Sequence, residues 1–265
     1  MPHVFTNGIR LSYERSGRGE RVLMIMGSSA AGRVWTLHQT PALNEAGYQA
    51  ITFDNRGIAP SDIPPGKYTM ADMVADTKGL IEALDAAPCR IVGVSLGAMI
   101  AQELAIQHPE LVRCAVLIAT KSRSDALRTA LGAAERALMQ SGVKLPADYE
   151  AAMSVLQMLS PATLKDDNAV SLWLETFRLA GAENSIGQTW INTDEDRRKA
   201  LQEISAPCRV IGFCDDFVTP PHLAAEVAEA IPECDYVAIP DCGHFGYLER
   251  PAEVNAAIID FLNEH

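Results

Sequence analysis

Short apolar segments alternate with longer helical patterns along most of the chain, and this alternation constrains the fold more than any other feature. Most of the short segments are apolar almost throughout, which is typical of strands that are covered on both faces. Such strands, separated by helices, predict an α/β protein with a parallel sheet and helices on both of its faces. The predicted strands are 10–15, 22–26, 50–54, 90–95, 115–120, 209–213 and 236–239. The first of them alternates more, and we expect it to be an antiparallel edge strand.

Start signals mark three of the intervening helices. Thr69 and Asp72 have the spacing of a capping box, and apolar residues then follow at three- and four-residue intervals. Thr219, which precedes two prolines, predicts the start of a second helix. Pro251 predicts the start of the last helix, which has one apolar side.

One long segment, residues 121–203, breaks the alternation. It contains no convincing strand, it is rich in Ala, Leu and Met, and it is too long for a plain crossover connection. We interpret it as several helices that form a cap, or lid, over the carboxyl edge of the sheet. The predicted organisation is therefore a core made of residues 1–120 and 204–265, with a helical cap, 121–203, inserted in it.

Composition and charge exclude several classes of function. A formal net charge of −12 repels nucleic acid and anionic lipid, so we expect a small-molecule substrate and neither nucleic acid nor membrane as a partner. No leader pattern opens the chain and no apolar segment could span a bilayer, so we expect a cytoplasmic protein. The six cysteines form no CxxC pair, and we expect them to be small buried hydrophobes and no metal to be bound. A homo-oligomer is left open.

A Gly-x-Ser-x-Gly pattern lies where the apolar segment 90–95 runs into a helical pattern. A chain that turns sharply from strand to helix leaves its central residue, Ser95, in a strained conformation with an exposed hydroxyl. Gly93 and Gly97 leave room for that turn. The start of the helix also favours developing negative charge. Ser95 is therefore the predicted nucleophile.

A serine needs a base, and His244 is the candidate among six histidines. It lies in a glycine-bracketed loop directly after the last predicted strand, where ligands bind in α/β folds. A carboxylate must then orient the base. Either Asp215 or Asp216, after segment 209–213, satisfies the spacing. The resulting chain order is Ser, Asp, His, the order of the α/β-hydrolases.

From about residue 9 onward the chain resembles an α/β-hydrolase, and within that superfamily it is similar to bacterial cofactor-free haloperoxidases and esterases. The resemblance rests on Gly93-Val-Ser95-Leu-Gly97, Asp54-Asn-Arg56-Gly57 with Ser61, Asp216-x-Val-x-Pro220 and Gly243-His244. It implies a mostly parallel, eight-stranded sheet with a helical cap and no cofactor. It also selects Asp216 as the acid, and it assigns Asp54 and Arg56 to bracing their loop rather than to chemistry.

The same resemblance implies an oxyanion hole made of the backbone N–H groups of Ser28 and Leu96. The chain departs from the family here, because Met26 precedes Gly27 where the family usually has a histidine that braces this loop. The missing histidine affects the expected path of this loop, and it leaves the predicted triad unchanged. A second departure is Ala59, where a glycine is usual.

These features predict a serine hydrolase that acts on a carboxylic ester or thioester of a small, largely apolar molecule, with perhydrolase or haloperoxidase side activity. The alternatives are a lyase or cyclase that uses the same site, and a non-catalytic binding protein. Trp35, Met153 and Trp173 are candidates for the substrate pocket, against ordinary packing. Trp190, Met139 and Met158 belong to the same group of candidates.

Overall fold

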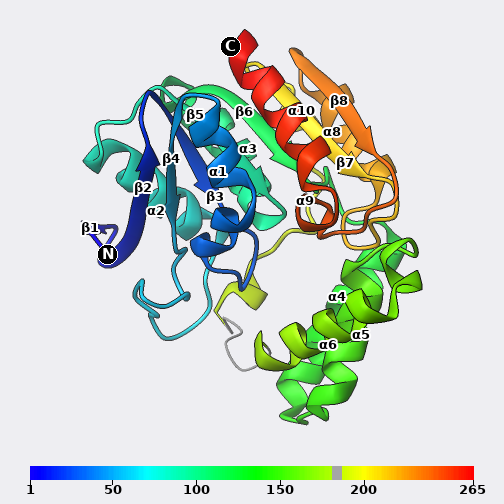
Figure 1. The fold of residues 1–265 in the computed structure, drawn as a ribbon. Helices are drawn as coiled ribbons and strands as arrows, with labels where there is room; N and C mark the ends of the chain where they lie inside the picture. Colours follow the sequence, from blue (N-terminus) through cyan, green and yellow to red (C-terminus); the bar gives the residue numbers. More distant parts are fainter. Residues whose placement is uncertain (181–186) are drawn as a thin grey trace.

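The computed structural model describes residues 1–180 and 187–265, and its centre is a twisted eight-stranded sheet (Figure 1). The strands lie in the order β1-β2-β4-β3-β5-β6-β7-β8. The pairs β1–β2 and β2–β4 are antiparallel, and all other neighbouring pairs are parallel. The strands are β1 (His3–Thr6), β2 (Ile9–Gly17), β3 (Glu20–Ile25), β4 (Tyr48–Phe53), β5 (Cys89–Val94), β6 (Val112–Ile118), β7 (Cys208–Phe213) and β8 (Cys234–Ile239). The predicted fold class is confirmed.

The edge of the sheet differs from the prediction. Segment 10–15 belongs to the antiparallel strand β2, but β1 pairs with its outer side, so β2 is not the edge. The two strands are joined at Asn7 and Gly8, which both have positive φ. An Asn-Gly pair of this kind is a strong hairpin signal. The Asn7-Gly8 pair is thus the sequence signal from which β1 could have been predicted.

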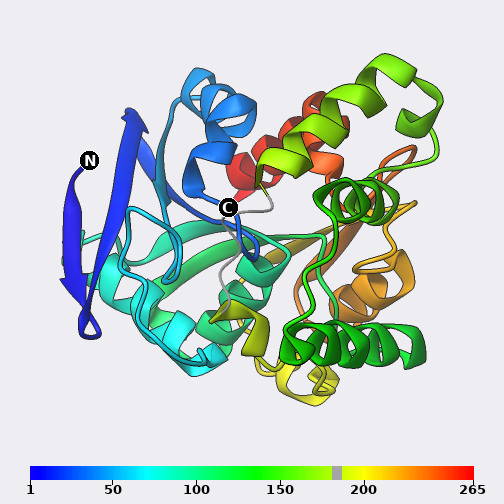
Figure 2. The same ribbon diagram turned by 90° about the horizontal axis from the view of Figure 1, so that it is seen from below.

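Helices cover both faces of the sheet because successive strand residues point to opposite sides. In β3, Val22 and Met24 pack into one apolar cluster and Leu23 and Ile25 into the other. Figure 2 shows the resulting layers, with α1 and α10 on one face and α2, α3 and α7 on the other. The helices of the first face are α1 (Gln39–Glu45) and α10 (Pro251–Glu264). Those of the second face are α2 (Met70–Ala83), α3 (Leu96–Gln107), α7 (Arg198–Leu201) and α8 (Pro221–Ala230).

All three predicted helix starts are confirmed, since α2, α8 and α10 each begin within two residues of the predicted start. Thr69 and Asp72 form both hydrogen bonds of a capping box at the start of α2. Pro251 is the first residue of α10. Thr219 does not cap α8, since Pro220 occupies that position and makes no side-chain cap. The hydroxyl of Thr219 is instead turned toward Asp216.

The segment between β6 and β7 contains three longer helices, α4 (Ala126–Ser141), α5 (Ala147–Met158) and α6 (Asp167–Ala180), and no strand in its described parts, 119–180 and 187–207. Figure 1 shows them as a group beside the sheet. Phe245, in the loop after β8, donates its N–H to the carbonyl of Met158 at the end of α5 (3.0 Å). These helices therefore touch the carboxyl edge of the sheet. The predicted cap boundaries also take in 181–186, which lie outside the described residues.

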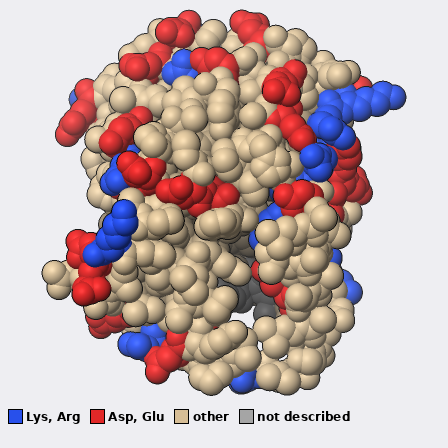
Figure 3. Space-filling view, turned by 90° about the vertical axis from the view of Figure 1, so that its right-hand side faces the viewer, with Lys and Arg blue, Asp and Glu red and all other residues tan. Residues whose placement is uncertain are grey.

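Apolar side chains are exposed on the surface of this helical group. No residue of α4 is buried, and several leucines of the group are largely exposed. Uncharged side chains dominate the lower part of Figure 3, where α4–α6 lie. The exposed leucines of the three helices are Leu127, Leu138, Leu156, Leu172 and Leu179.

All six cysteines are free thiols, and four of them are buried. Burial raises the pKa of Cys89 and of Cys242 to about 12, which keeps these thiols protonated and unreactive. Cys214 is exposed. Within the described residues, no helix combines the length and apolarity needed to cross a membrane.

Candidate active site

Ser95 occupies the sharp turn between β5 and α3, with φ 54° and ψ −118°. A non-glycine residue is strained in this region, and the strain must be held by its surroundings. The N–H of Ser95 donates to the carbonyl of Ile118 on the adjacent strand (2.9 Å). A Cβ on Gly93 would lie 2.5 Å from the carbonyl oxygen of Gly97, and a Cβ on Gly97 would lie 2.1 Å from that of Ile25. Both glycines are therefore required by the close approach of backbones.

The structure brings Ser95, His244 and Asp216 into one hydrogen-bonded line. Ser95 Oγ lies 3.1 Å from His244 Nε2, and His244 Nδ1 lies 2.8 Å from Asp216 Oδ2. His244 and Asp216 are buried, whereas Ser95 is partly exposed. This is the geometry in which a histidine accepts the serine proton while a carboxylate fixes its tautomer.

Asp216 is the aspartate that reaches His244, and the loop after β7 holds it firmly. Its Oδ1 accepts the N–H groups of Val218 (2.7 Å) and Thr219 (2.8 Å). Its Oδ2 accepts the hydroxyl of Thr219 (2.7 Å) as well as the histidine. These three donors hold the carboxylate in place beside His244. Thr219 was predicted as a helix start, so its contact with the acid is a feature that the sequence did not reveal.

Glu249, in the short helix α9 (Gly246–Glu249), braces the histidine loop and was also missed. One carboxylate oxygen accepts the N–H of Gly243 (2.7 Å). The other accepts the N–H and hydroxyl of Ser160 (3.0 and 2.9 Å) and the hydroxyl of Thr163 (2.5 Å). A single carboxylate thus fastens the loop that bears His244 to the chain that follows α5.

The loop after β3, which bears Ser28, passes directly beside the nucleophile. A Cβ on Gly27 would lie 3.3 Å from Cβ of Ser95, so only a glycine lets the loop pass this closely. Met26 is buried in the core, and its carbonyl accepts the side-chain amide of Asn55 (3.1 Å). Ser28 itself is exposed. Leu96 is the first residue of α3, where helix geometry leaves a backbone N–H without an intrahelical partner.

Another contact on this loop comes from far along the chain. Gln188 begins the short 3-10 helix η4 (Gln188–Trp190), and its Oε1 accepts the N–H of Ser29 (2.7 Å) and the hydroxyl of Ser28 (3.3 Å). Neither periodicity nor a motif marks Gln188, because the contact spans about 160 residues of sequence.

Asp54 and Arg56 lie beside this region and make structural contacts. Asp54 Oδ1 accepts the N–H of Gly32 (2.8 Å), and burial raises the pKa of this carboxyl. Arg56 forms a buried two-point pair with Asp76 of α2 (2.5 and 2.6 Å). Burial raises the pKa of Asp76, and its bonds with Arg56 act against that rise.

The three candidate pocket residues have different surroundings. Trp173, on α6, packs against Phe245, the neighbour of His244 (5.8 Å between ring centroids). Met153, on α5, is exposed. Trp35 is fully buried in the core against Tyr247 (5.6 Å between ring centroids). This contact agrees with ordinary core packing, the alternative to a pocket role.

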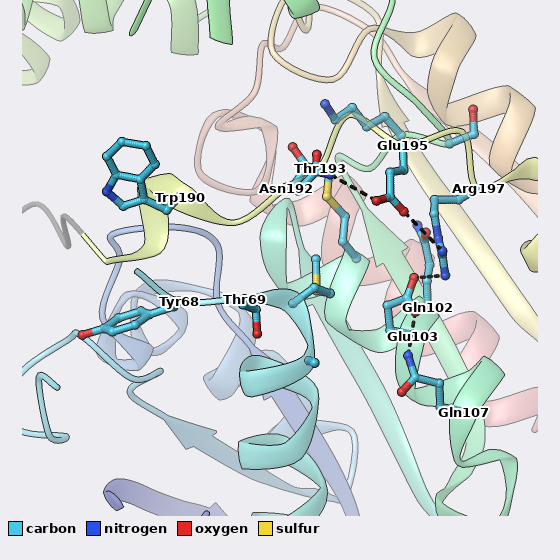
Figure 4. Close-up of a pocket in the computed structure, with 15 residues that line it drawn as sticks. Tyr68, Thr69, Gln102, Glu103, Gln107, Trp190, Asn192, Thr193, Glu195 and Arg197 are labelled. Atoms are coloured by element: carbon cyan, nitrogen blue, oxygen red, sulfur yellow. Dashed lines mark hydrogen bonds and ion pairs between the residues drawn. The ribbon is translucent and has the colours of Figure 1, made fainter. Parts of the chain in front are cut away.

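A cavity of about 340 Å³ lies along α3, between the start of α2 and the segment 190–197 (Figure 4). Met99, one helical turn beyond Ser95, is part of its wall, but neither Ser95 nor His244 is among the described residues that line it. The cavity thus lies beside the triad rather than over it. Trp190, Arg197 and Lys121 are among the lining residues, and burial lowers the pKa of Lys121 to about 8.

Comparison with known proteins gives consistent matches. A family model described as "alpha/beta hydrolase fold" matches residues 20–251. "Putative non-heme bromoperoxidase BpoC" of Mycobacterium tuberculosis (strain ATCC 25618 / H37Rv) is 48% identical over 257 residues, which cover 96% of this chain and 98% of that protein. Its crystal structure matches with a TM-score of 0.92 at 47% identity, over 96% of both chains.

More distant matches extend the range of named activities. "Putative carbamate hydrolase RutD" of Cronobacter turicensis is 28% identical over 243 residues, which cover 89% of this chain and 88% of that protein. A thermophilic esterase from Thermogutta terrifontis has the same fold, with a TM-score of 0.83 at 23% identity over 99% of this chain and 98% of that one.

Proposed function

Because the chain belongs to the α/β-hydrolase fold family, we propose that it is a serine hydrolase that cleaves a carboxylic ester or thioester of a small, largely apolar molecule. The family membership confirms the resemblance inferred from the sequence motifs. The observation that carries the proposal is the hydrogen-bonded line from Ser95 through His244 to Asp216. A serine, a base and an orienting carboxylate in this geometry are the requirements for acyl transfer.

In the first half of the reaction, Ser95 Oγ attacks the substrate carbonyl and passes its proton to His244 Nε2. The carbonyl oxygen becomes an oxyanion, and the N–H groups of Ser28 and Leu96 donate hydrogen bonds to it. When the tetrahedral intermediate collapses, the bond to the leaving group breaks, and His244 gives its proton to the leaving alcohol or thiol. The acyl group is then an ester of Ser95.

In the second half, a water molecule attacks the acyl-enzyme while His244 accepts one of its protons. Collapse of the second tetrahedral intermediate releases the carboxylic acid, and the proton returns to Ser95 Oγ. Asp216 orients His244 and stabilises the imidazolium formed in each half. All of these steps use side chains and backbone groups of this chain.

An aromatic group beside the base supports an apolar acyl or leaving group. Phe245 stacks on Phe177 of α6 (5.7 Å between centroids) and also contacts Trp173. His244 lies next to Phe245 (6.3 Å between ring centroids). These rings form an apolar surface that extends from the base to α6, which suits a small hydrophobic ester better than a charged one.

A second reaction of the same acyl-enzyme is favoured by the name of the relative that is 48% identical, a bromoperoxidase. Hydrogen peroxide in place of water would attack the acyl-enzyme and release a peracid and free Ser95. The peracid then transfers one oxygen to bromide, which yields hypobromite and the original carboxylic acid. This route needs the triad and no metal.

The first experiment tests whether Ser95 is a live nucleophile. We expect a fluorophosphonate probe to label the wild-type protein on Ser95 and to leave Ser95→Ala unlabelled. Ser12→Ala is the matched control, because Ser12 is a fully buried serine on β2, and it should be labelled like the wild type. Folded wild-type protein that takes up no label would refute the proposal and favour a binding protein.

The second experiment identifies the reaction. A panel of nitrophenyl esters, thioesters and carbamates of increasing chain length measures hydrolysis, and bromination of a dye in acetate, peroxide and bromide measures perhydrolysis. We expect turnover of short apolar esters, lost in Ser95→Ala. Labelling of Ser95 without turnover of any acyl compound would favour lyase or cyclase chemistry at this site.

A further inference from the structure

The loop that carries Ser28 needs a brace, because its backbone is strained. Ser29 has φ 58°, in the left-handed region that non-glycine residues rarely adopt. Met26, on the other side of Gly27, is an apolar residue packed in the core, so its side chain cannot form a hydrogen bond to hold the loop. The position of the Ser28 N–H therefore depends on contacts made by other residues.

Gln188 supplies such a contact through both ends of its side-chain amide. Its Oε1 accepts the N–H of Ser29 at 2.7 Å, and its Nε2 donates to the carbonyl oxygen of Arg56 at 2.8 Å. These partners fix the orientation of the amide, since reversing it would set donor against donor and acceptor against acceptor. The side chain is buried, with 3% of its surface exposed, so water does not compete for these bonds.

Both neighbours of Gln188 in this arrangement are themselves anchored. Arg56 is held by its buried ion pair with Asp76 of α2. Gly187 accepts the N–H of Tyr68 (3.1 Å), and a Cβ at Gly187 would lie 2.4 Å from the Tyr68 ring. The backbone of Gly187 thus lies against the ring of Tyr68. This contact fixes the position of the Gln188 backbone relative to the Ser28–Ser29 loop that its side chain contacts.

We propose that Gln188 is a positioning residue of the oxyanion hole: its amide ties the backbone of the Ser28–Ser29 loop to the carbonyl of Arg56. The inference rests on the proposed acyl-transfer function. It also places η4, the short 3-10 helix that bears Gln188, in the catalytic apparatus. An oxyanion donor must be placed where charge develops in the transition state, so a displaced loop slows chemistry without weakening substrate binding.

The test compares Gln188→Met with the wild type. Methionine keeps the length of the side chain and removes both hydrogen bonds. We expect kcat for a nitrophenyl ester to fall by about 10- to 100-fold while KM changes by less than about threefold. A trifluoromethyl ketone is attacked by Ser95 Oγ, and its carbonyl oxygen then becomes an oxyanion. The affinity of the variant for this inhibitor should fall by a similar factor. A purely structural role would not link these two losses.

Thr77→Val is the matched control. Thr77 is also fully buried, and its hydroxyl donates to the carbonyl of Met73 (2.8 Å) within α2, so the substitution removes a buried hydrogen bond that touches neither the Ser28 loop nor the triad. We expect this variant to lose thermal stability and to keep the wild-type kcat and ketone affinity. Equal losses in both variants would show that loosened packing, rather than the oxyanion loop, accounts for the effect, and would overturn the inference.

Gln188→Glu keeps the inference testable if the methionine variant does not fold. In this variant an ionised carboxylate would accept from Ser29 but could not donate to Arg56, whereas a protonated carboxyl group could do both. The ratio of variant to wild-type kcat should therefore rise several-fold between about pH 8 and pH 5.5. A ratio that stays constant contradicts the inference.

The outcomes separate the two proposals. A wild-type protein that a fluorophosphonate does not label refutes the serine hydrolase and the inference together. A labelled, active wild type with an equally active Gln188→Met variant refutes the inference alone.

Discussion

At the scale of single residues, the site is built from groups whose conformations or charges are unfavourable elsewhere. Ser95 and Ser29 both have positive φ, and both are held by hydrogen bonds to their N–H groups. Asp216 is buried but accepts three hydrogen bonds from its own loop. The arrangement is therefore preorganised: the energetic cost of placing these groups is met by folding rather than at each turnover.

Asp216→Asn tests the orienting role. We expect kcat to fall by roughly 10³- to 10⁴-fold, because the amide nitrogen that replaces Oδ2 would donate to His244 Nδ1 and so favour the wrong tautomer. Asp215→Asn is the control on the adjacent residue and should stay within about twofold of the wild type. Steady-state hydrolysis of a nitrophenyl ester measures both. If Asp216→Asn retained a tenth of the activity or more, another carboxylate would have to orient the base.

Lys121 gives a pH-dependent prediction about stability. Burial lowers its pKa from 10.5 to about 8 in the folded protein. Between these values the unfolded chain binds more protons than the folded one, so the contribution of Lys121 to stability rises with pH. The cost of burying the charge is present in full below about pH 8 and is relieved by about pH 10.5.

The measurement is the difference in free energy of unfolding between the wild type and Lys121→Met, from pH 7 to 10.5. Buried cysteines titrate equally in both proteins, so their effect cancels. The difference should shift in favour of the wild type by on the order of 3 kcal/mol across this range. Lys144→Met, at an exposed lysine, should show no such shift. A flat difference for Lys121→Met would mean that Lys121 stays charged when folded.

At the scale of elements, the apolar pattern predicted every strand except β1, and motifs predicted that Ser95, Asp216 and His244 act together, but neither predicted the braces. Gly93, Ser95 and Gly97 are close in sequence, so their shared turn can be recognised from a short pattern. The choice between Asp215 and Asp216 required a family resemblance, since both follow the same strand. Gln188 and Glu249 could not be predicted, because each contacts residues that only the folded chain brings near.

Glu249→Gln tests one such brace. All four groups that face the carboxylate are donors, so an amide would turn its own N–H groups against some of them. We expect a loss of about 2 kcal/mol in unfolding free energy and a severalfold lower kcat, as the loop of His244 loosens. Glu253→Gln, an exposed acid on α10, should change neither. Urea unfolding and ester hydrolysis measure the two effects, and an unaltered stability would show that the loop is held by other contacts.

At the scale of the whole molecule, the core and the helical group α4–α6 differ in how they are packed. The two apolar clusters on either side of the sheet draw residues from strands and covering helices alike. By contrast, no residue of α4 is buried. Segments with few buried contacts open at lower free energy than the core, so we expect this group to move as a unit separate from the sheet. We propose on this basis that residues 121–203 act as the cap of the site.

Limited proteolysis tests this difference. The connection between α4 and α5 is exposed around Lys144, so trypsin should cut there first. We expect the nicked protein to stay assembled and to keep fluorophosphonate labelling of Ser95. Mass spectrometry identifies the first cut, and Lys144→Gln should delay it. First cuts inside β3–β6 would show that the core opens as readily as the helical group.

The order of the triad along the chain has a consequence for how the protein is made. Ser95 is synthesised long before Asp216 and His244, which follow β7 and β8 in the chain. Because synthesis proceeds from the N-terminus, the nascent chain displays a serine with no base to activate it until the last strands have been added and paired. The hydrolase cannot act on metabolites while it is still emerging from the ribosome, and catalytic power appears only with the completed sheet.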